Sequence, residues 1–212
     1  MKRAVILLNG TPPQKELAVR YTRDTAVYCC DGAAKWAQEY GIEIAYLIGD
    51  MDSLDSRILD HYIACGVHIR KLQEEKDETD AQIALQMAME DGAMQITLLG
   101  ATGKRLDHMM GNLMLLKKAY DAGCEAYIVD EYSRVYVQNG AFEIQGRAGQ
   151  LVSVLPMGEN VRCVATKGLY YPCSDKLLRN DEPLFLSNYM TQERAYIHLD
   201  GYAWVVLSEE LK

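Results

Sequence analysis

The chain has 212 residues, of which 49% are hydrophobic and 25% charged, and its net charge is −8. This apolar content excludes intrinsic disorder, and the acidic excess argues against a broad nucleic-acid surface. No apolar stretch approaches the roughly 18 residues of a membrane span. Six cysteines without a CxxC pair or zinc-ligand spacing indicate a reduced, cytoplasmic protein.

The first 131 residues alternate between short apolar runs and helical patterns. Buried strands are predicted at 3–8, 25–30, 42–48, 66–70, 94–99 and 125–129. Helices are predicted between them at 13–21, 33–40, 55–65, 79–91 and 105–122. In the last of these, Leu106, Met109, Met110 and Leu113 share the spacing of one helix face. Apolar strands separated by helices predict an α/β, Rossmann-like parallel sheet with helices on both faces.

The pattern changes near residues 131–134, after which strand signals dominate. Asn139-Gly140 and Asp200-Gly201 each lie between two apolar alternations and predict two-residue hairpin turns. The strands expected around and between them are 134–138, 141–145, 149–155 and 161–166. We therefore predict a smaller C-terminal antiparallel β-sandwich or barrel. The predicted domains are residues 1–132 and 133–212.

The first acidic segment, Gly49-Asp50-Met51-Asp52-Ser53, follows a predicted buried strand. Carboxylates two positions apart in an extended loop can point the same way, so Asp50 and Asp52 could share a hard cation such as Mg²⁺. The alternative interpretation is an Asx turn that caps the next helix.

The second acidic segment, Asp77-Glu78-Thr79-Asp80, begins a predicted helix. Thr79 has Gln82 three residues on, which is the spacing of a capping box. A solvated acidic cap would explain this segment by itself. Beside Asp50 and Asp52, however, Asp80 is a candidate third oxygen ligand.

The third segment, Gly100–His108, runs from a strand into a helix. Its two glycines allow a phosphate to approach the backbone closely, and Lys104 and Arg105 supply positive charge. The spacing is neither that of a P-loop nor G-x-G-x-x-G. Carboxylates repel a polyphosphate unless a divalent ion and basic groups intervene. The three segments together therefore predict magnesium-dependent phosphoryl or pyrophosphoryl transfer.

Six segments, in this order, resemble the thiamine pyrophosphokinase family. They are Asp31-Gly32-Ala33-Ala34, Gly49–Ser53, Asp77–Asp80, Gly100–His108, Thr166–Pro172 and Ser187-Asn188. The resemblance implies transfer of the pyrophosphoryl group of ATP to the hydroxyethyl group of thiamine, giving thiamine diphosphate and AMP. It also implies a homodimer in which thiamine lies between one subunit's α/β domain and its partner's β domain.

The resemblance also assigns roles to individual residues. It implies that Asp50, Asp52 and Asp80 bind Mg²⁺. The catalytic residues are expected to be these three with Arg105 and Asp107. The nucleotide-binding residues are expected to be Asp31, Thr79, Lys104, Arg105 and His108. The thiamine-binding residues are expected to be Tyr171, Ser187 and Asn188. Asp80 and Asp107 are both candidates for the base, and a loose transition state could dispense with one.

Three other functions remain open on the residues alone. The acceptor could be another small alcohol such as a hydroxymethylpterin, because the nucleotide half does not identify it. A non-catalytic thiamine- or nucleotide-binding regulator could use the same scaffold. A metal phosphohydrolase could use the Asp50–Asp52 pair with Asp107 and His108, although histidine ligands are scarce.

Overall fold

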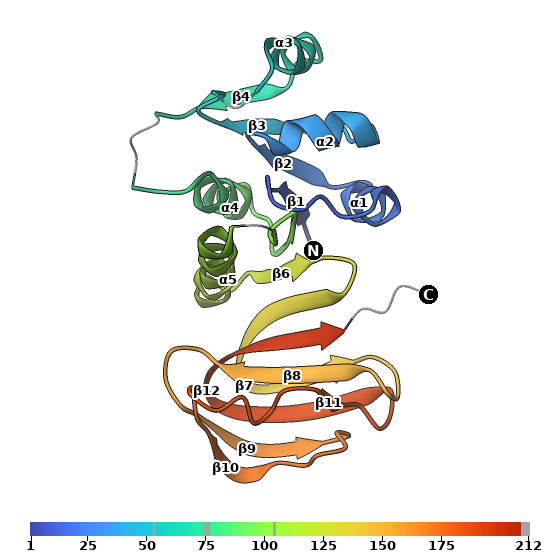
Figure 1. The fold of residues 1–212 in the computed structure, drawn as a ribbon, viewed down its shortest axis with the longest axis vertical. Coiled ribbons are helices and arrows are strands. Elements are labelled where there is room, and N and C mark those ends of the chain that lie inside the picture. The colour runs from blue at the N-terminus through green and yellow to red at the C-terminus, as the bar shows by residue number, and fades with distance from the viewer. Residues whose placement is uncertain (53, 74–76, 104, 209–212) are drawn as a thin grey trace. The chain divides into compact units, whose positions relative to one another are not determined.

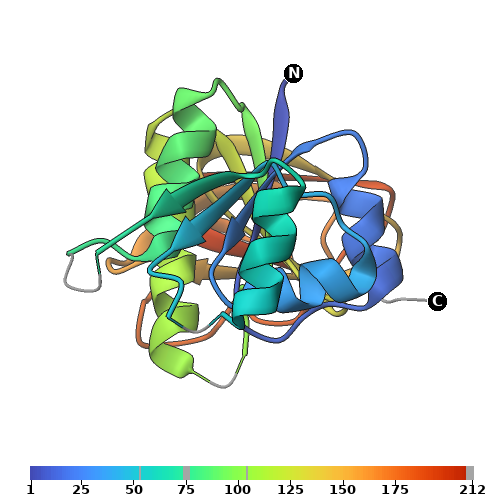
Figure 2. The same cartoon turned by 90° about the horizontal axis from the view of Figure 1, so that it is seen from above.

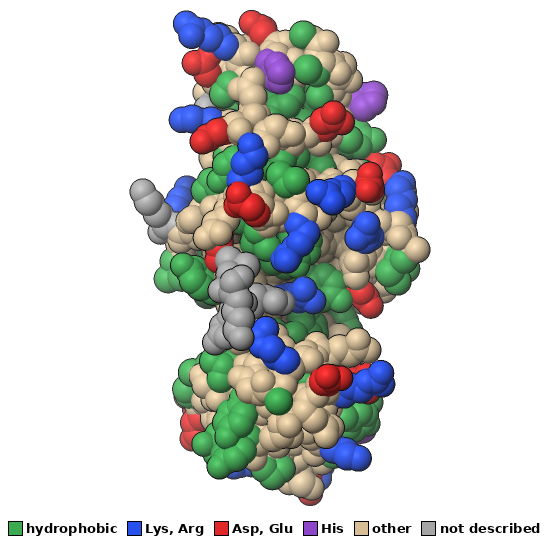
Figure 3. All heavy atoms as spheres, turned by 90° about the vertical axis from the view of Figure 1, so that its right-hand side faces the viewer, with side chains coloured by type: hydrophobic (Ala, Val, Ile, Leu, Met, Phe, Trp, Pro, Cys, Tyr) green, Lys and Arg blue, Asp and Glu red, His purple; other side chains and the backbone are tan. Residues whose placement is uncertain are grey.

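The computed structural model describes the chain except residues 53, 74–76, 104 and 209–212, and it divides into two compact units (Figure 1). The first unit is Met1–Glu131 and the second is Tyr132–Lys212. Across the described residues, no helix has both the length and the apolar character that a membrane span needs. On the face shown in Figure 3, basic and acidic side chains are interspersed.

The described part of the first unit is built on a parallel sheet. Its strands are β1 (Arg3–Leu7), β2 (Ala26–Cys30), β3 (Tyr46–Gly49), β4 (His68–Lys71), β5 (Gln95–Leu99) and β6 (Glu125–Val129). They lie in the order β6-β5-β1-β2-β3-β4, and every pair is parallel. The chain moves outward from β1 to β4 and then returns to β5. This reversal creates the switch point beside which open α/β sheets bind ligands.

Helices cover both faces of this sheet, as predicted (Figure 2). One face carries α1 (Lys15–Thr22), α2 (Ala33–Tyr40) and α3 (Ser56–Ala64), and the other carries α4 (Asp80–Glu90) and α5 (Leu106–Asp121). Leu17, Trp36 and Tyr62 from the first three helices pack on Val27 and Leu47 of the sheet. The apolar strands are buried on both sides, which is why they appear in the sequence as continuous apolar runs.

Helix α5 buries a different face from the one its apolar spacing suggested. Leu115, Leu116 and Ala119 are its buried residues, whereas Leu106 is 63% and Met110 is 51% exposed. A helix of 16 residues is about 24 Å long, and a five-residue strand spans about 17 Å. The first turns of α5 therefore extend past the strands, where the sheet cannot cover them.

The second unit is an antiparallel β structure, as predicted. Its described strands are β7 (Ser133–Gln145), β8 (Leu151–Pro156), β9 (Val161–Lys167), β10 (Ser174–Leu178), β11 (Asn188–Tyr189) and β12 (Arg194–Ser208). Strand β12 pairs with β7 along both of its halves. Its first half also pairs with β9 and its second half with β8. One long strand thus serves two layers, which enclose a core that includes Val154, Phe185 and Ile197.

Both predicted hairpin turns are wrong. Asn139-Gly140 lies inside β7 and Asp200-Gly201 lies inside β12. Phe142 therefore pairs with Ile197 of β12, whereas a hairpin at Asn139-Gly140 would pair it with Val137. The two glycines have φ values of 82° and 121°, and the backbone N–H of Gly201 donates to Asn139 Oδ1 at 3.2 Å. The turn-forming residues instead produce a bulge at which both strands bend from one layer into the other.

Candidate active site

Two neighbouring strands, β2 and β3, end at the same edge of the sheet and place acidic residues there. Asp31 directly follows β2, and its backbone N–H donates to the carbonyl of Ile48 on β3 at 2.8 Å. A Cβ added to Gly49 would lie 2.9 Å from the Cβ of Asp31. A side chain at position 49 would therefore displace Asp31, and glycine there lets the two strand ends approach.

The loop after β3 directs two more carboxylates toward Asp31. The backbone N–H of Asp52 donates to Asp50 Oδ1 at 3.1 Å, while Met51, with φ of 68°, packs against the core. One carboxylate oxygen each from Asp31, Asp50 and Asp52 lie within 4.8 Å of one another. An Asx hydrogen bond thus shapes the loop that presents the oxygens. The next helix, α3, is capped by Asp55, which accepts a hydrogen bond from the backbone N–H of Arg57 at 2.9 Å, and not by Asp50 or Asp52.

This oxygen cluster fits a magnesium ion by its chemistry. Mg²⁺ is a hard cation that binds a few carboxylate oxygens and completes its octahedron with water and phosphate oxygens. Asp31 and Asp50 are half-buried and Asp52 is exposed, so the cluster is accessible from one side. Asp31, which we expected to contact nucleotide, is thus placed with the expected metal ligands.

Asp80 lies outside this cluster in the described part of the chain. It is the first residue of α4, and its Oδ1 is shielded from solvent. The predicted N-cap is confirmed, because Thr79 accepts a hydrogen bond from the backbone N–H of Gln82 at 3.2 Å. The side chain of Gln82 donates to Glu78 Oε1 at 2.9 Å. The Thr79 hydroxyl therefore caps helix α4 in this structure.

The loops after β1 and β5 join at the switch point. The backbone N–H of Gly10 donates to the carbonyl of Gly100 at 2.9 Å, and that of Thr11 donates to the carbonyl of Thr102 at 2.7 Å. The side chain of Asn112 on α5 donates to the carbonyl of Ala101 at 2.8 Å, which holds the second loop. Lys104, expected to bind phosphate, lies outside the described residues.

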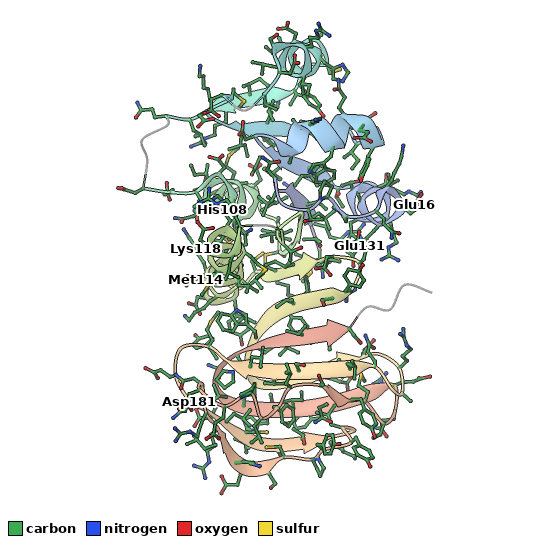
Figure 4. The ribbon with its side chains drawn as sticks, viewed as in Figure 1. Glu16, His108, Met114, Lys118, Glu131 and Asp181 are labelled. Carbon is green, nitrogen blue, oxygen red and sulfur yellow. The ribbon has the colours of Figure 1, made fainter. Side chains whose placement is uncertain are left out.

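Arg105 and Asp107 form a bidentate ion pair at the start of α5. Arg105 Nε and Nη2 donate to the two carboxylate oxygens of Asp107 at 3.2 and 2.6 Å. Hydrogen bonds from Arg105 lower the pKa of Asp107 to about 2. Both side chains are exposed, so the pair adds little stability and can exchange partners readily. His108, one residue further on α5, is also exposed (Figure 4).

In the second unit, two of the expected thiamine residues, Tyr171 and Ser187, lie in loops, and the third, Asn188, begins β11 and is buried. Tyr171 lies between β9 and β10, and its backbone N–H donates to Asn188 Oδ1 at 3.0 Å. Asn188 Nδ2 donates back to the carbonyl of Tyr171 at 2.8 Å, and Asn188 is 1% exposed. Asn188 therefore positions the Tyr171 loop. Ser187 is exposed, and its backbone N–H donates to Ser153 Oγ at 3.0 Å.

An exposed aromatic cluster surrounds this loop. The ring of Tyr170 stacks on Tyr189, with centroids 4.5 Å apart and planes 18° apart. The ring of Tyr171 meets Tyr170 edge-on at 4.9 Å and 87°, and Tyr171 is 60% exposed. Such a fixed, exposed ring offers a flat surface to a planar or cationic ligand. The sequence analysis did not single out Tyr170 or Tyr189, although Tyr170 adjoins Tyr171.

The α/β unit, with carboxylates gathered at the carboxyl edge of its sheet, has the architecture of a nucleotide-using enzyme. The family description "Thiamin pyrophosphokinase, catalytic domain" matches residues 20–128, and "Thiamin pyrophosphokinase, vitamin B1 binding domain" matches 141–203. The chain belongs to the thiamin pyrophosphokinase family.

Individual relatives agree with this assignment. The chain is 26% identical to the thiamine pyrophosphokinase of Bacillus subtilis (strain 168) over 156 residues, which cover 73% of each chain. A crystal structure of thiamin pyrophosphokinase from Geobacillus thermodenitrificans superposes with a TM-score of 0.84 at 27% identity, covering 98% of this chain and 97% of that one. The crystal structure of the Bacillus subtilis protein has a TM-score of 0.88 at 23% identity, with 99% and 100% covered.

Proposed function

We propose that this protein transfers the pyrophosphoryl group of ATP to the hydroxyethyl group of thiamine, giving thiamine diphosphate and AMP. The observation that carries the proposal is the convergence of Asp31, Asp50 and Asp52, whose carboxylate oxygens lie within 4.8 Å of one another. Such a cluster can bind a triphosphate through a divalent cation. Family membership supports thiamine as the acceptor.

In this proposal, Asp31, Asp50 and Asp52 hold Mg²⁺, and Asp80 approaches the bound nucleotide from the start of α4. When bound, Mg²⁺ withdraws charge from the phosphoryl oxygens and so favours attack at phosphorus. The Asp31 backbone is bonded to β3, and Asp50 Oδ1 accepts a hydrogen bond from the Asp52 N–H, so both carboxylates are positioned before substrate arrives. This preorganisation lowers the reorganisation needed for the reaction.

Arg105 neutralises the migrating group in this proposal. Its guanidinium already makes two parallel hydrogen bonds to the carboxylate of Asp107, and the same fork matches two phosphoryl oxygens. Asp107 is a weak base, because a carboxylate with a pKa of about 2 binds protons poorly at neutral pH. A loose transition state places little demand on such a base. Thr79, Lys104 and His108 complete the proposed nucleotide site.

Thiamine, a flat cation, would lie on the exposed ring of Tyr171, with Ser187 beside it and Asn188 holding the loop. The proposed assembly is a cytoplasmic homodimer in which thiamine contacts the α/β unit of one subunit and the β unit of the other. Sedimentation of the full chain tests the assembly, since a monomer would contradict a site shared between subunits.

Product analysis tests the reaction itself. The full chain is incubated with ATP, MgCl₂ and thiamine, and the products are separated by chromatography. We expect AMP and thiamine diphosphate in equal amounts, with little product when EDTA replaces Mg²⁺. A parallel reaction with a hydroxymethylpterin tests the rival acceptor. Formation of ADP, or preference for the pterin, would contradict the proposal.

A further inference from the structure

The loop that presents Asp50 and Asp52 has a backbone conformation that its central residue does not favour. Met51, between the two carboxylates, has φ of 68°, which lies in the left-handed region. In this region the Cβ of a residue comes close to the following carbonyl oxygen, so glycine is the residue that adopts it most readily. The centre of the carboxylate loop is therefore strained.

Met51 differs from the other residues that share this conformation. In the described part of the chain, the remaining non-glycine residues with positive φ are Asp24, Asp31, Asp175 and Ser187. Aspartate and serine can offset the cost, because their short polar side chains form hydrogen bonds with the local backbone. The thioether of Met51 has no donor and is a weak acceptor. A different interaction must hold residue 51 in this conformation.

Packing on the hydrophobic core provides that interaction. Met51 is half-buried and packs against the core that lies between the sheet and helices α1, α2 and α3. The free energy gained by partly burying a methionine is of the same order as the cost of one left-handed residue. The conformation of the loop therefore depends on the side chain of Met51.

This packing acts on the carboxylates at either side of Met51. The backbone N–H of Asp52 donates to Asp50 Oδ1 at 3.1 Å, which joins the two residues across Met51. One oxygen from each lies within 4.8 Å of an oxygen of Asp31. Like charges at this separation repel one another, so the ion-free protein needs a contact that keeps the carboxylates together.

We propose that Met51 is a positioning residue, whose packing on the core holds the loop in the left-handed conformation that brings Asp50 and Asp52 together beside Asp31. The inference rests on the proposed function, in which this cluster binds Mg²⁺. It adds a residue that acts on the ion only through the two carboxylates. Replacement of groups that orient metal ligands commonly lowers metal affinity about ten- to hundredfold.

Titration with Mn²⁺ alone tests the proposal without nucleotide or turnover. Mn²⁺ accepts the same oxygen ligands as Mg²⁺, and the free ion is measured by electron paramagnetic resonance. In Met51→Ala we expect the Kd for Mn²⁺ to rise about ten- to hundredfold. Met51→Leu restores an apolar side chain of similar volume and should recover most of the affinity. The matched control is Ile58→Ala, which removes a half-buried side chain of α3 from the same core and should bind Mn²⁺ like the wild type.

Met51→Gly separates the effect of packing from the effect of backbone strain. Glycine adopts the left-handed conformation without strain but has no side chain to pack on the core. This variant should therefore lose Mn²⁺ affinity as Met51→Ala does. Wild-type affinity in Met51→Ala or Met51→Gly, or an equal loss in Ile58→Ala, would overturn the positioning role.

Solvent exchange of the Asp52 amide, followed by NMR in EDTA, gives a measurement that needs no ion. This N–H is bonded to Asp50 Oδ1, so its exchange should be faster in Met51→Ala and Met51→Gly than in the wild type and Ile58→Ala. Equal exchange in all of these proteins would overturn the positioning role. Absence of Mn²⁺ binding by the wild type contradicts the proposed magnesium site instead, and the exchange rates then judge Met51.

Steady-state kinetics distinguishes positioning from a general loss of stability. In Met51→Ala we expect a higher MgCl₂ concentration at half-maximal rate and an unchanged KM for thiamine. A fall in kcat with the wild-type dependence on Mg²⁺ would contradict the inference. Absence of thiamine diphosphate with every preparation contradicts the proposed function, while the Mn²⁺ titration and the amide exchange still judge Met51.

Discussion

Replacing Asp52 by Asn removes one negative charge from the three carboxylates. At the 4.8 Å limit of their oxygen separations, two unit charges repel by about 0.9 kcal/mol in bulk water and about 3.5 kcal/mol at an effective dielectric constant of about 20. Asp52 is exposed, so the lower value applies, and physiological salt reduces it by roughly half. With Asp31 and Asp50 as neighbours, the substitution should stabilise the ion-free protein by about 1 kcal/mol.

Magnesium should reverse the order of stability, so that the wild type becomes more stable than Asp52→Asn. An ion that binds the folded state stabilises the wild type by about 2.7 kcal/mol at a hundred times its Kd. Asp52→Asn loses a charged oxygen ligand and therefore most of this gain. For a chain of this size, 1 kcal/mol shifts Tm by about 2–4 °C. The variant should thus melt above the wild type in EDTA and below it in MgCl₂.

Differential scanning calorimetry in both buffers measures the crossover. Asp60→Asn, at an exposed position of α3 outside the cluster, is the matched control and should behave like the wild type in both. Lower stability of Asp52→Asn in EDTA, together with an undiminished magnesium shift, would refute the reasoning about repulsion and ion binding.

Two further predictions concern single contacts. Arg105→Gln should return the pKa of Asp107 from about 2 toward 3.8, as followed by carboxyl-carbon NMR, because the guanidinium hydrogen bonds favour the charged form. Since this pKa is lowered on folding, the pair's stabilisation is present at neutral pH and is lost between about pH 4 and 2; an unchanged midpoint would contradict the pairing. Asn188→Ala should cost about 1–3 kcal/mol in urea unfolding, because both backbone groups of Tyr171 lose their buried partner. Asn180→Ala, which removes the exposed hydrogen bond from Asn180 Nδ2 to the carbonyl of Gly158, is the control and should cost less.

The wrong hairpins show where local signals are insufficient. Asn-Gly and Asp-Gly favour positive φ, and the structure does use that conformation at Gly140 and Gly201. Positive φ serves a tight turn and a bulge equally well. The structure pairs β7 with β12 along their length, and that pairing depends on residues some 60 positions apart.

The carboxylate cluster also has one part that local sequence determines and one part that depends on the tertiary structure. Asp50 and Asp52 are two residues apart, so local loop geometry suffices to bring their oxygens together. The partner of this pair in the structure is Asp31, from the end of the adjacent strand, and Asp80 lies outside the described cluster. Strand neighbours are set by the order of the whole sheet, which the chain's linear pattern leaves open.

Short-range chemistry alone determined the alternation of strands and helices, the Thr79 cap, the acidic loops and the change to β structure near Glu131. These features depend on neighbours a few residues away, where backbone geometry and side-chain spacing act directly. Tertiary structure decided that Asp31 joins Asp50 and that β12 serves two layers. Each of these requires segments far apart in the chain to become neighbours, and burial of the shared core selects that arrangement.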